Sequence, residues 1–76
     1  MKEEYKEYYK MIGLKVAYYR KCRELTQEQL AEKMGVDTSF IGQIEARNIS
    51  KAISMDTLFR ISEALDVPAY KFLRFD

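Results

Sequence analysis

The chain has 76 residues, of which 47% are hydrophobic and 33% are charged, and its net charge at pH 7 is +1. This length suits a single domain, and the composition is that of a folded protein rather than a disordered tail. The apolar stretches are too short to cross a bilayer, and the amino terminus is charged where a signal peptide is apolar. We therefore expect one domain over residues 1–76, in the cytoplasm and without a membrane partner.

The residue types that most enzymes use are scarce. The chain has no histidine, and Cys22 is its only cysteine. An internal disulfide, the usual zinc site and the usual pair of nucleophile and base cannot be assembled from this set. We therefore expect no enzyme, no metal and no cofactor, and the sequence indicates no small-molecule ligand. The near-neutral charge means that any binding to DNA must depend on where a few cations lie.

The first predicted element is a helix over about residues 2–24. Its apolar and aromatic residues recur at intervals of three and four, which marks one face of a helix. These residues are Tyr5, Tyr8, Tyr9, Ile12, Val16 and Tyr19. We interpret the tyrosine stripe as a packing surface, because aromatic platforms that stack on bases usually lie on sheets.

Two short helices are predicted next, over residues 27–34 and 38–46. Thr26 and Gln29 have the spacing of a capping box, which starts the first of them. Gly35 supplies the left-handed conformation that ends it, and Asp37 is placed to cap the next helix. In that next helix Phe40, Ile41 and Ile44 should face inward. At about 100° per residue, the opposite face is small and polar.

After Glu45 the sequence predicts a loop and two further helices. The loop carries Arg47 and Lys51. Ser54 can cap a helix over residues 55–65, which should stop at Asp66. Pro68 suits the first turn of a fifth helix over residues 68–74. The fold class that these elements predict is an all-α, compact five-helix bundle.

The spacing of these residues resembles the phage-repressor type of helix-turn-helix, the Cro-like or XRE family. The resemblance extends from Ile12 to about Leu73. It rests on the segments IGLKVAYYR at residues 12–20, TQEQLAEKMGV at 26–36, FIGQIE at 40–45 and SMDTLFRISEALDV at 54–67. It implies a lambda repressor-like DNA-binding domain whose helix over 38–46 enters the major groove of double-stranded DNA.

The resemblance also implies roles for individual residues. Base contacts are implied on the outer face of the third helix, for Thr38, Ser39, Gly42 and Gln43. Phosphate contacts are implied at the start of the second helix and in the loop, for Gln27, Arg47, Asn48 and Lys51. A structural ion pair is implied between Arg20 and Glu45.

Three departures from the family pattern bear on these roles. Gly42 has no side chain at a position that often helps to contact the groove, and it loosens the helix by about 1 kcal/mol relative to alanine. The loop after Glu45 lacks the usual glycine and is two residues longer than the common pattern. Asp66 replaces a glycine at the end of the fourth helix, which aspartate tolerates better than most residues.

The function that the sequence predicts is a sequence-specific DNA-binding transcriptional regulator, a repressor that acts as a homodimer on a palindromic operator. One recognition helix contacts too few base pairs to specify a site in a genome. We expect the dimer contact in the apolar tail, at Tyr70, Phe72 and Phe75, with the tyrosine-rich first helix as the alternative surface. A rival is a protein-interaction or antitoxin-like subunit with the same fold, which the near-neutral charge favours. An enzyme is the weaker rival, because no set of titrating residues converges.

Overall fold

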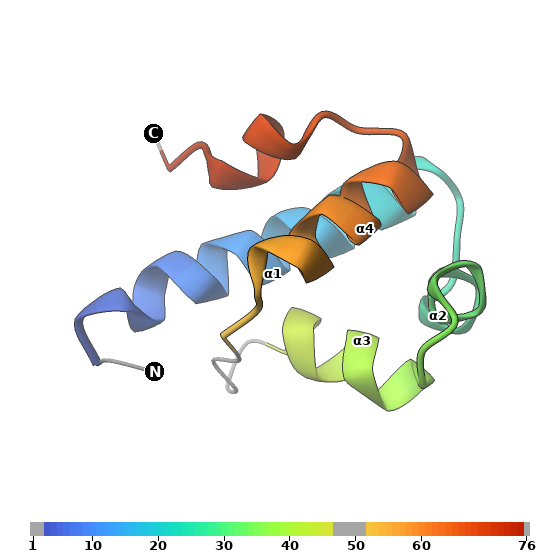
Figure 1. Ribbon diagram of the computed structural model, residues 1–76, viewed down its shortest axis with the longest axis horizontal. Helices are drawn as coiled ribbons and strands as arrows, with labels where there is room; N and C mark the ends of the chain where they lie inside the picture. Colours follow the sequence, from blue (N-terminus) through green and yellow to red (C-terminus); the bar gives the residue numbers. More distant parts are fainter. Residues whose placement is uncertain (1–2, 47–51, 76) are drawn as a thin grey trace.

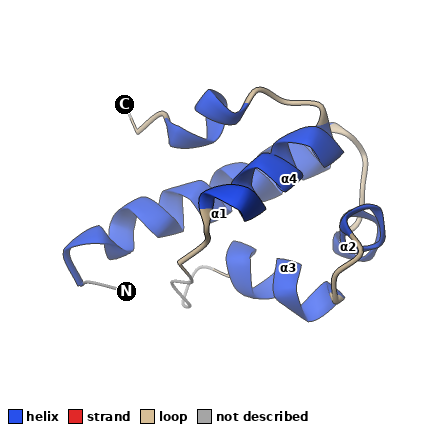
Figure 2. Cartoon of the chain, viewed as in Figure 1, coloured by secondary structure: helices blue, strands red, loops and turns tan. Residues whose placement is uncertain are grey.

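The computed structural model describes residues 3–46 and 52–75, and in this part of the chain helices joined by loops are found, without strands (Figures 1 and 2). The α-helices are α1 (Lys6–Cys22), α2 (Gln27–Met34), α3 (Thr38–Glu45) and α4 (Met55–Leu65). Two 3₁₀ segments accompany them, η1 (Glu3–Tyr5) and η2 (Ala69–Leu73). The all-α class that the sequence predicts is confirmed.

The helices are arranged around the long α1. α3 packs against both α1 and α2, α2 also contacts α4, and α4 in turn contacts α1 (Figure 1). After α4 the chain turns back so that η2 lies along α1. One apolar core results, formed by Ile12, Val16, Leu30, Ala31, Met34, Ile41, Ile44, Leu58, Ile61, Leu65, Val67 and Phe72.

Both ends of the chain differ from the sequence prediction. The first α-helix begins at Lys6, after the 3₁₀ turn, and ends at Cys22. It cannot continue because Glu24 has a φ of 57°, a left-handed conformation that no cue in the sequence indicated. The fifth helix is a 3₁₀ segment, Ala69–Leu73, in which the Lys71 N–H donates to the Pro68 carbonyl over three residues. Five residues are too few for a stable α-helix, so four α-helices replace the predicted five in the described part of the chain.

Local signals set the ends of the central helices. Thr26 Oγ1 accepts from the Gln29 N–H at 3.0 Å, and Gln29 Oε1 accepts from the Thr26 N–H at 2.8 Å, which completes the capping box. Gly35 ends α2 with a φ of 70°. Ser54 caps α4 through the Thr57 N–H at 3.1 Å, and Asp66 ends that helix with a φ of 55°. These residues fix where α2 and α4 begin and end.

The cap of α3 is weaker than expected. Asp37 takes the extended N-cap conformation, with φ of −70° and ψ of 146°, but within the described chain its carboxylate makes no capping hydrogen bond. Its backbone carbonyl accepts instead from the Phe40 N–H at 3.0 Å. Asp37 is therefore the N-cap residue that the sequence predicts, but it lacks the side-chain hydrogen bond of a full cap, and α3 depends on its packing against α1 and α2 for its position.

Two arginines hold the ends of helices together. Arg23 donates to the carbonyls of Leu65 and Asp66 at 2.7 and 2.8 Å, which ties the end of α1 to the end of α4. Arg60 donates to the Met34 carbonyl at the end of α2. Because the last carbonyls of a helix have no partner within it, these guanidinium groups satisfy acceptors that would otherwise be orphaned.

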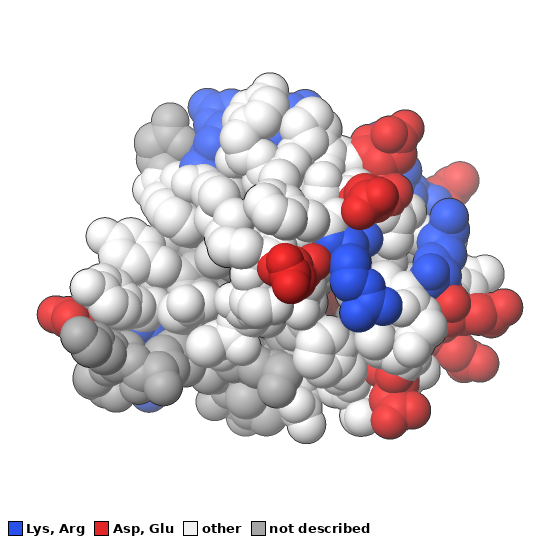
Figure 3. Space-filling model, viewed as in Figure 1, with Lys and Arg blue, Asp and Glu red and all other residues white. Residues whose placement is uncertain are grey.

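Charge is unevenly spread over the surface. On the face in Figure 3, acidic and basic side chains gather at the end that holds α2, while the surface over the first half of α1 and the start of α4 is largely uncharged. Within residues 3–46 and 52–75, no helix has the length and apolar character needed to span a membrane.

Candidate nucleic-acid interface

α2 and α3 form a helix-turn-helix whose outer face is polar. Residues 35–37 separate the two helices, and α3 buries Ile41 and Ile44, with at most 4% of either exposed. Thr38, Ser39 and Gln43 are exposed on the opposite side of α3. These are the three side chains to which the resemblance gives base contacts, and they share one solvent-facing surface. The opposite face of α3 is buried in the core.

Gly42, the fourth residue with an implied base contact, is half-buried within this surface. A Cβ built at Gly42 would lie 3.6 Å from Oε1 of Gln27 and in open space otherwise. This separation is an ordinary van der Waals contact, so packing does not require glycine here. The absence of a side chain leaves Gln43 as the long polar group in the middle of α3.

Gly13 in α1 sets the distance between α1 and α3, a role that the sequence analysis did not assign. A Cβ at this position would lie 2.0 Å from the backbone oxygen of Ile44, which is impossible without moving the backbone. Glycine therefore allows the end of α3 to rest directly on α1. A lone glycine inside a strongly helical pattern was the available signal, since such a residue often marks close approach of another element.

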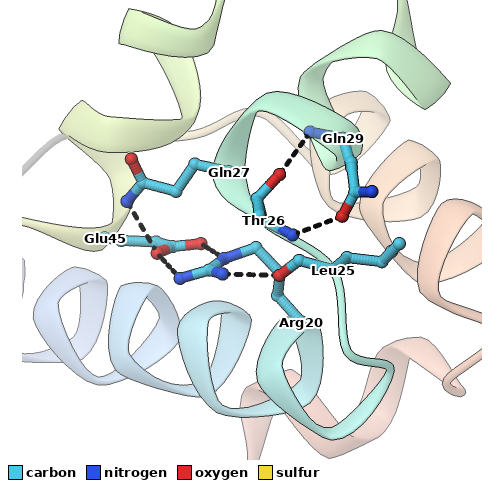
Figure 4. A network of polar contacts seen from close by, with 6 residues as sticks. All are labelled: Arg20, Leu25, Thr26, Gln27, Gln29 and Glu45. Atoms are coloured by element: carbon cyan, nitrogen blue, oxygen red, sulfur yellow. Dashed lines mark hydrogen bonds and ion pairs between the residues drawn. The ribbon is translucent and has the colours of Figure 1, made fainter.

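Glu45 joins three helices in a polar network (Figure 4). Arg20 donates from Nε to Oε2 at 2.8 Å and from Nη2 to Oε1 at 2.9 Å, and its Nη1 donates to the Leu25 carbonyl at 2.7 Å. The two side chains are 9% and 5% exposed. Hydrogen bonding to Glu45 raises the pKa of Arg20 above its ordinary value, against the opposing effect of burial. This bidentate pair fixes the end of α3 relative to α1.

Gln27, with an implied phosphate contact, belongs to the same network. Its Nε2 donates to Oε1 of Glu45 at 3.0 Å, and the amide oxygen points away from the network (Figure 4). One of the two hydrogens on the Gln27 side-chain amide is thus already bonded within the protein. Thr26 already accepts from the Gln29 N–H, so the donors that this region can offer to an anion are the backbone amides of Gln27 and Glu28 and the second amide hydrogen of Gln27.

A cleft of about 410 Å³ separates α1 from α3 beside this network. Its lining includes Tyr18 and Lys21 on α1, Gln27 on α2 and Gly42 on α3. Lys21 is exposed, and no contact was expected of it from the sequence. The remaining residues with implied phosphate contacts, Arg47, Asn48 and Lys51, lie outside the described residues.

The three residues expected at a dimer contact have different environments. Tyr70 is 61% exposed and Phe75 is 36% exposed, whereas Phe72 is fully buried. The Phe72 ring packs edge-on against Tyr19 with 5.3 Å between centroids. Phe72 therefore belongs to the core, where it anchors the tail on α1, and its assignment to a dimer contact is wrong.

Comparison with known sequences gives a family and several relatives. The helix-turn-helix family model matches residues 16–72. The HTH-type transcriptional regulator SinR of Bacillus subtilis (strain 168) is 38% identical over 63 residues, which cover 83% of this chain and 56% of SinR. Control protein C.SmaI of Serratia marcescens is 32% identical over 63 residues, which cover 83% of this chain and 73% of that protein. The chain thus spans little more than half the length of SinR.

Solved structures share the same architecture. The crystal structure of SinR, a master regulator for biofilm formation, in complex with DNA superposes with a TM-score of 0.76 at 36% identity and covers 83% of this chain and 98% of that one. The restriction-modification controller protein C.AhdI from Aeromonas hydrophila gives a TM-score of 0.76 at 25% identity, covering 84% of this chain and 94% of that one.

Proposed function

The chain belongs to the XRE-type helix-turn-helix family, and from this membership we propose that it is a sequence-specific DNA-binding transcriptional regulator. The single observation that carries the proposal is the exposed polar face of α3, with Thr38, Ser39 and Gln43 directed away from the core. A helix with such a face fits the major groove, where all four base pairs present different donors and acceptors.

In this proposal α3 contacts base edges. Gln43 can form two hydrogen bonds to adenine, whereas the hydroxyl groups of Thr38 and Ser39 can bond to several bases. The buried Ile41 and Ile44 and the network at Glu45 support the helix from behind. Because that support is rigid, the three polar side chains meet the groove in a defined orientation.

Phosphate contacts flank the recognition helix. We assign them to the Gln27 side chain and the backbone amides of Gln27 and Glu28, to Lys21 at the rim of the neighbouring cleft, and to Arg47, Asn48 and Lys51 in the loop after α3. Backbone amides at a helix N-terminus and isolated cations are the groups that position proteins on DNA. A few well-placed cations suffice here, which fits a net charge of only +1.

The chain acts, in this proposal, as one domain in the cytoplasm and as a homodimer on a palindrome. Half-site centres then lie about 34 Å apart, one turn of the duplex. Occupation of a promoter by the dimer represses transcription. The relative SinR is named as a transcriptional regulator and has been crystallised with DNA, which supports the proposal.

A second candidate is a subunit whose main partner is a protein. The near-neutral charge favours it, and so does a solved complex of the SinR and SinI proteins, which superposes with a TM-score of 0.75 at 36% identity over 84% of this chain and 61% of that one. This candidate predicts weak DNA affinity that hardly depends on salt.

Selection of duplexes from a random pool at two salt concentrations separates the two candidates. We expect enrichment of a palindrome, with affinity that falls as salt rises because phosphate contacts release counterions. A pool that remains unenriched at both concentrations would contradict the proposal and favour the protein-binding candidate.

A further inference from the structure

An apolar groove lies at the end of the molecule opposite to α2. It has a volume of about 300 Å³, and its lining includes Tyr5 from η1 and Tyr8 from the start of α1, Ile53 and Met55 around the start of α4, and Leu73 and Phe75 from the tail. We call this surface the aromatic groove. It takes no part in the proposed contacts with DNA.

The walls of the aromatic groove are held by ring contacts. Tyr8 packs against Phe75 with 5.0 Å between ring centroids, and Tyr5 stacks on Tyr8 at 6.5 Å. The tail that carries Leu73 and Phe75 is anchored by the buried Phe72. Side chains that are already ordered lose little conformational entropy when a partner covers them, so the groove is preorganised for binding.

A protruding aromatic side chain stands beside the groove. Phe59 is 47% exposed and follows Met55 by four residues on α4, so the two side chains are neighbours on the helix surface. The next residue, Arg60, donates to the Met34 carbonyl, which directs its charge toward α2. Each copy of the chain therefore carries an apolar groove and, one helical turn away, an apolar side chain that protrudes.

We propose that a second copy of this chain covers the groove, with Phe59 of each copy inserted into the aromatic groove of the other. In a two-fold contact, residue i of one copy meets residue j of its partner, and residue j of the first copy meets residue i of the partner. A groove and an exposed side chain on the same face can therefore form the same contact twice. The inference gives a contact surface to the proposed homodimer and rests on the proposed function in that respect.

The distribution of charge favours a second copy over another protein. No charged side chain lines the groove in the part of the chain that the structure describes. On the face in Figure 3 the surface over the first half of α1 and the start of α4 is largely uncharged, and basic side chains lie farther out, over the tail. A charged side chain near a two-fold axis lies close to the same side chain of the other copy, and the two repel each other. A self-complementary contact therefore favours an uncharged patch. Asp56 and Glu63 flank Phe59 along α4 and would lie at the rim, where water screens them.

The exposed apolar area matches the requirement of a stable dimer. Tyr5, Tyr8, Met55, Phe59, Leu73 and Phe75 are each between 36% and 51% exposed. At about 200 Å² for each large side chain, they present about 500 Å² of apolar surface. A standard interface buries about 800 Å² per partner, and about 65% of a homodimer interface is apolar, which also gives about 500 Å².

Sedimentation velocity and native mass spectrometry test the proposal with four variants. Phe59→Ser removes the protrusion and Leu73→Glu places a charge in the groove. Leu14→Ser is the matched control, because Leu14 is 44% exposed on α1 but lines the other cleft. Tyr70→Ser tests the outer face of the tail. We expect concentration-dependent dimers of the wild type, a loss of about tenfold or more in dimer affinity for the first two variants, and no change for the last two.

Mixing the Phe59→Ser and Leu73→Glu variants distinguishes the loss of an interface from a folding defect. Phe59→Ser keeps an intact groove and Leu73→Glu keeps Phe59, so a mixed dimer retains one of the two contacts and should form more readily than either variant alone. Circular dichroism checks that each variant is helical, and Met55→Glu replaces Leu73→Glu if the latter unfolds. A wild type that stays monomeric at all concentrations, a failure of the mixture to form mixed dimers, or a loss confined to Tyr70→Ser would overturn the proposal.

Binding to a single half-site distinguishes this proposal from the proposed function. Phe59→Ser should bind a duplex with one half-site as well as the wild type does, and lose only cooperative binding to the complete palindrome. If the wild type dimerises through the groove but binds no DNA, the function is wrong and the groove assignment stands. If Phe59→Ser keeps cooperative binding to the palindrome, the groove assignment is wrong and the function stands.

Discussion

The two ends of α1 support different surfaces. Its carboxyl-terminal half holds α3 through the directional, bidentate hydrogen bonds between Arg20 and Glu45. Tyr19 in the same half also anchors the tail through Phe72. The amino-terminal half of α1 contacts the end of the tail through Tyr8 and Phe75 and leaves the aromatic groove open. A polar surface with fixed geometry suits the recognition of base edges, whereas an apolar surface suits the burial of area against a protein. The two proposed contacts, with DNA and with a second copy of the chain, therefore use separate surfaces and do not compete.

The largest effect is expected at the polar end, from Glu45→Ala. Removal of this carboxylate leaves the buried Arg20 guanidinium without its partner and frees the Gln27 amide. Breaking a buried ion pair on one side costs about 3 to 5 kcal/mol. Urea denaturation should show the loss, while Phe59→Ser at the other end should change the free energy of unfolding by about 1 kcal/mol or less. If both variants lost the same free energy of unfolding, the two ends of α1 would not differ in how they support the fold.

The next largest loss of stability is expected from Gly13→Ala, in the middle of α1 where the end of α3 rests on it. The added methyl group must displace the backbone of Ile44, and overpacking of this kind costs about 1 to 3 kcal/mol. Because alanine otherwise favours a helix, a stabilised variant would show that α1 and α3 are not in close contact. The matched control is Gly42→Ala, where a Cβ has room, and this change should leave stability the same or slightly higher.

The helix-turn-helix could be predicted from the sequence because its limits are local. A capping box, a left-handed glycine and a serine cap act within a few residues of themselves, so Thr26, Gly35 and Ser54 reveal the ends of helices without knowledge of the fold. The outward placement of Thr38, Ser39 and Gln43 follows from the helical period alone. The all-α class follows from the same signals.

The features that could not be predicted depend on contacts distant in sequence. Phe72 and Phe75 look alike in an apolar tail, yet one fills the core against Tyr19 and the other lines the groove against Tyr8. Arg23 and Arg60 look like surface cations, but they satisfy carbonyls of other helices. Gln27 is held by Glu45, 18 residues away. Local periodicity cannot distinguish such roles, because it carries no information on which elements meet.

A smaller effect, confined to DNA binding, is expected for Gln43→Ala. The exposed side chain has no role in the core, so the free energy of unfolding should change by less than about 0.5 kcal/mol. Affinity for the selected site should fall by about 1 to 3 kcal/mol, with relaxed selectivity at one base pair. Competition binding with single-base variants of the site measures both quantities. An equal loss on specific and random duplexes would place Gln43 on the phosphate backbone instead.

The smallest effect is expected for Lys21→Ala at the rim of the cleft. If Lys21 neutralises one phosphate, the slope of log affinity against log salt should fall by about 0.9, on specific and on random DNA alike. Lys33→Ala provides the matched control, because Lys33 is an exposed lysine in the last turn of α2, at the opposite end of that helix from Gln27. The control should leave the slope unchanged. Identical slopes for both variants would show that the DNA backbone does not pass the cleft between α1 and α3. The phosphate contacts on this side of α3 would then be absent, and only those of the loop after α3 would remain.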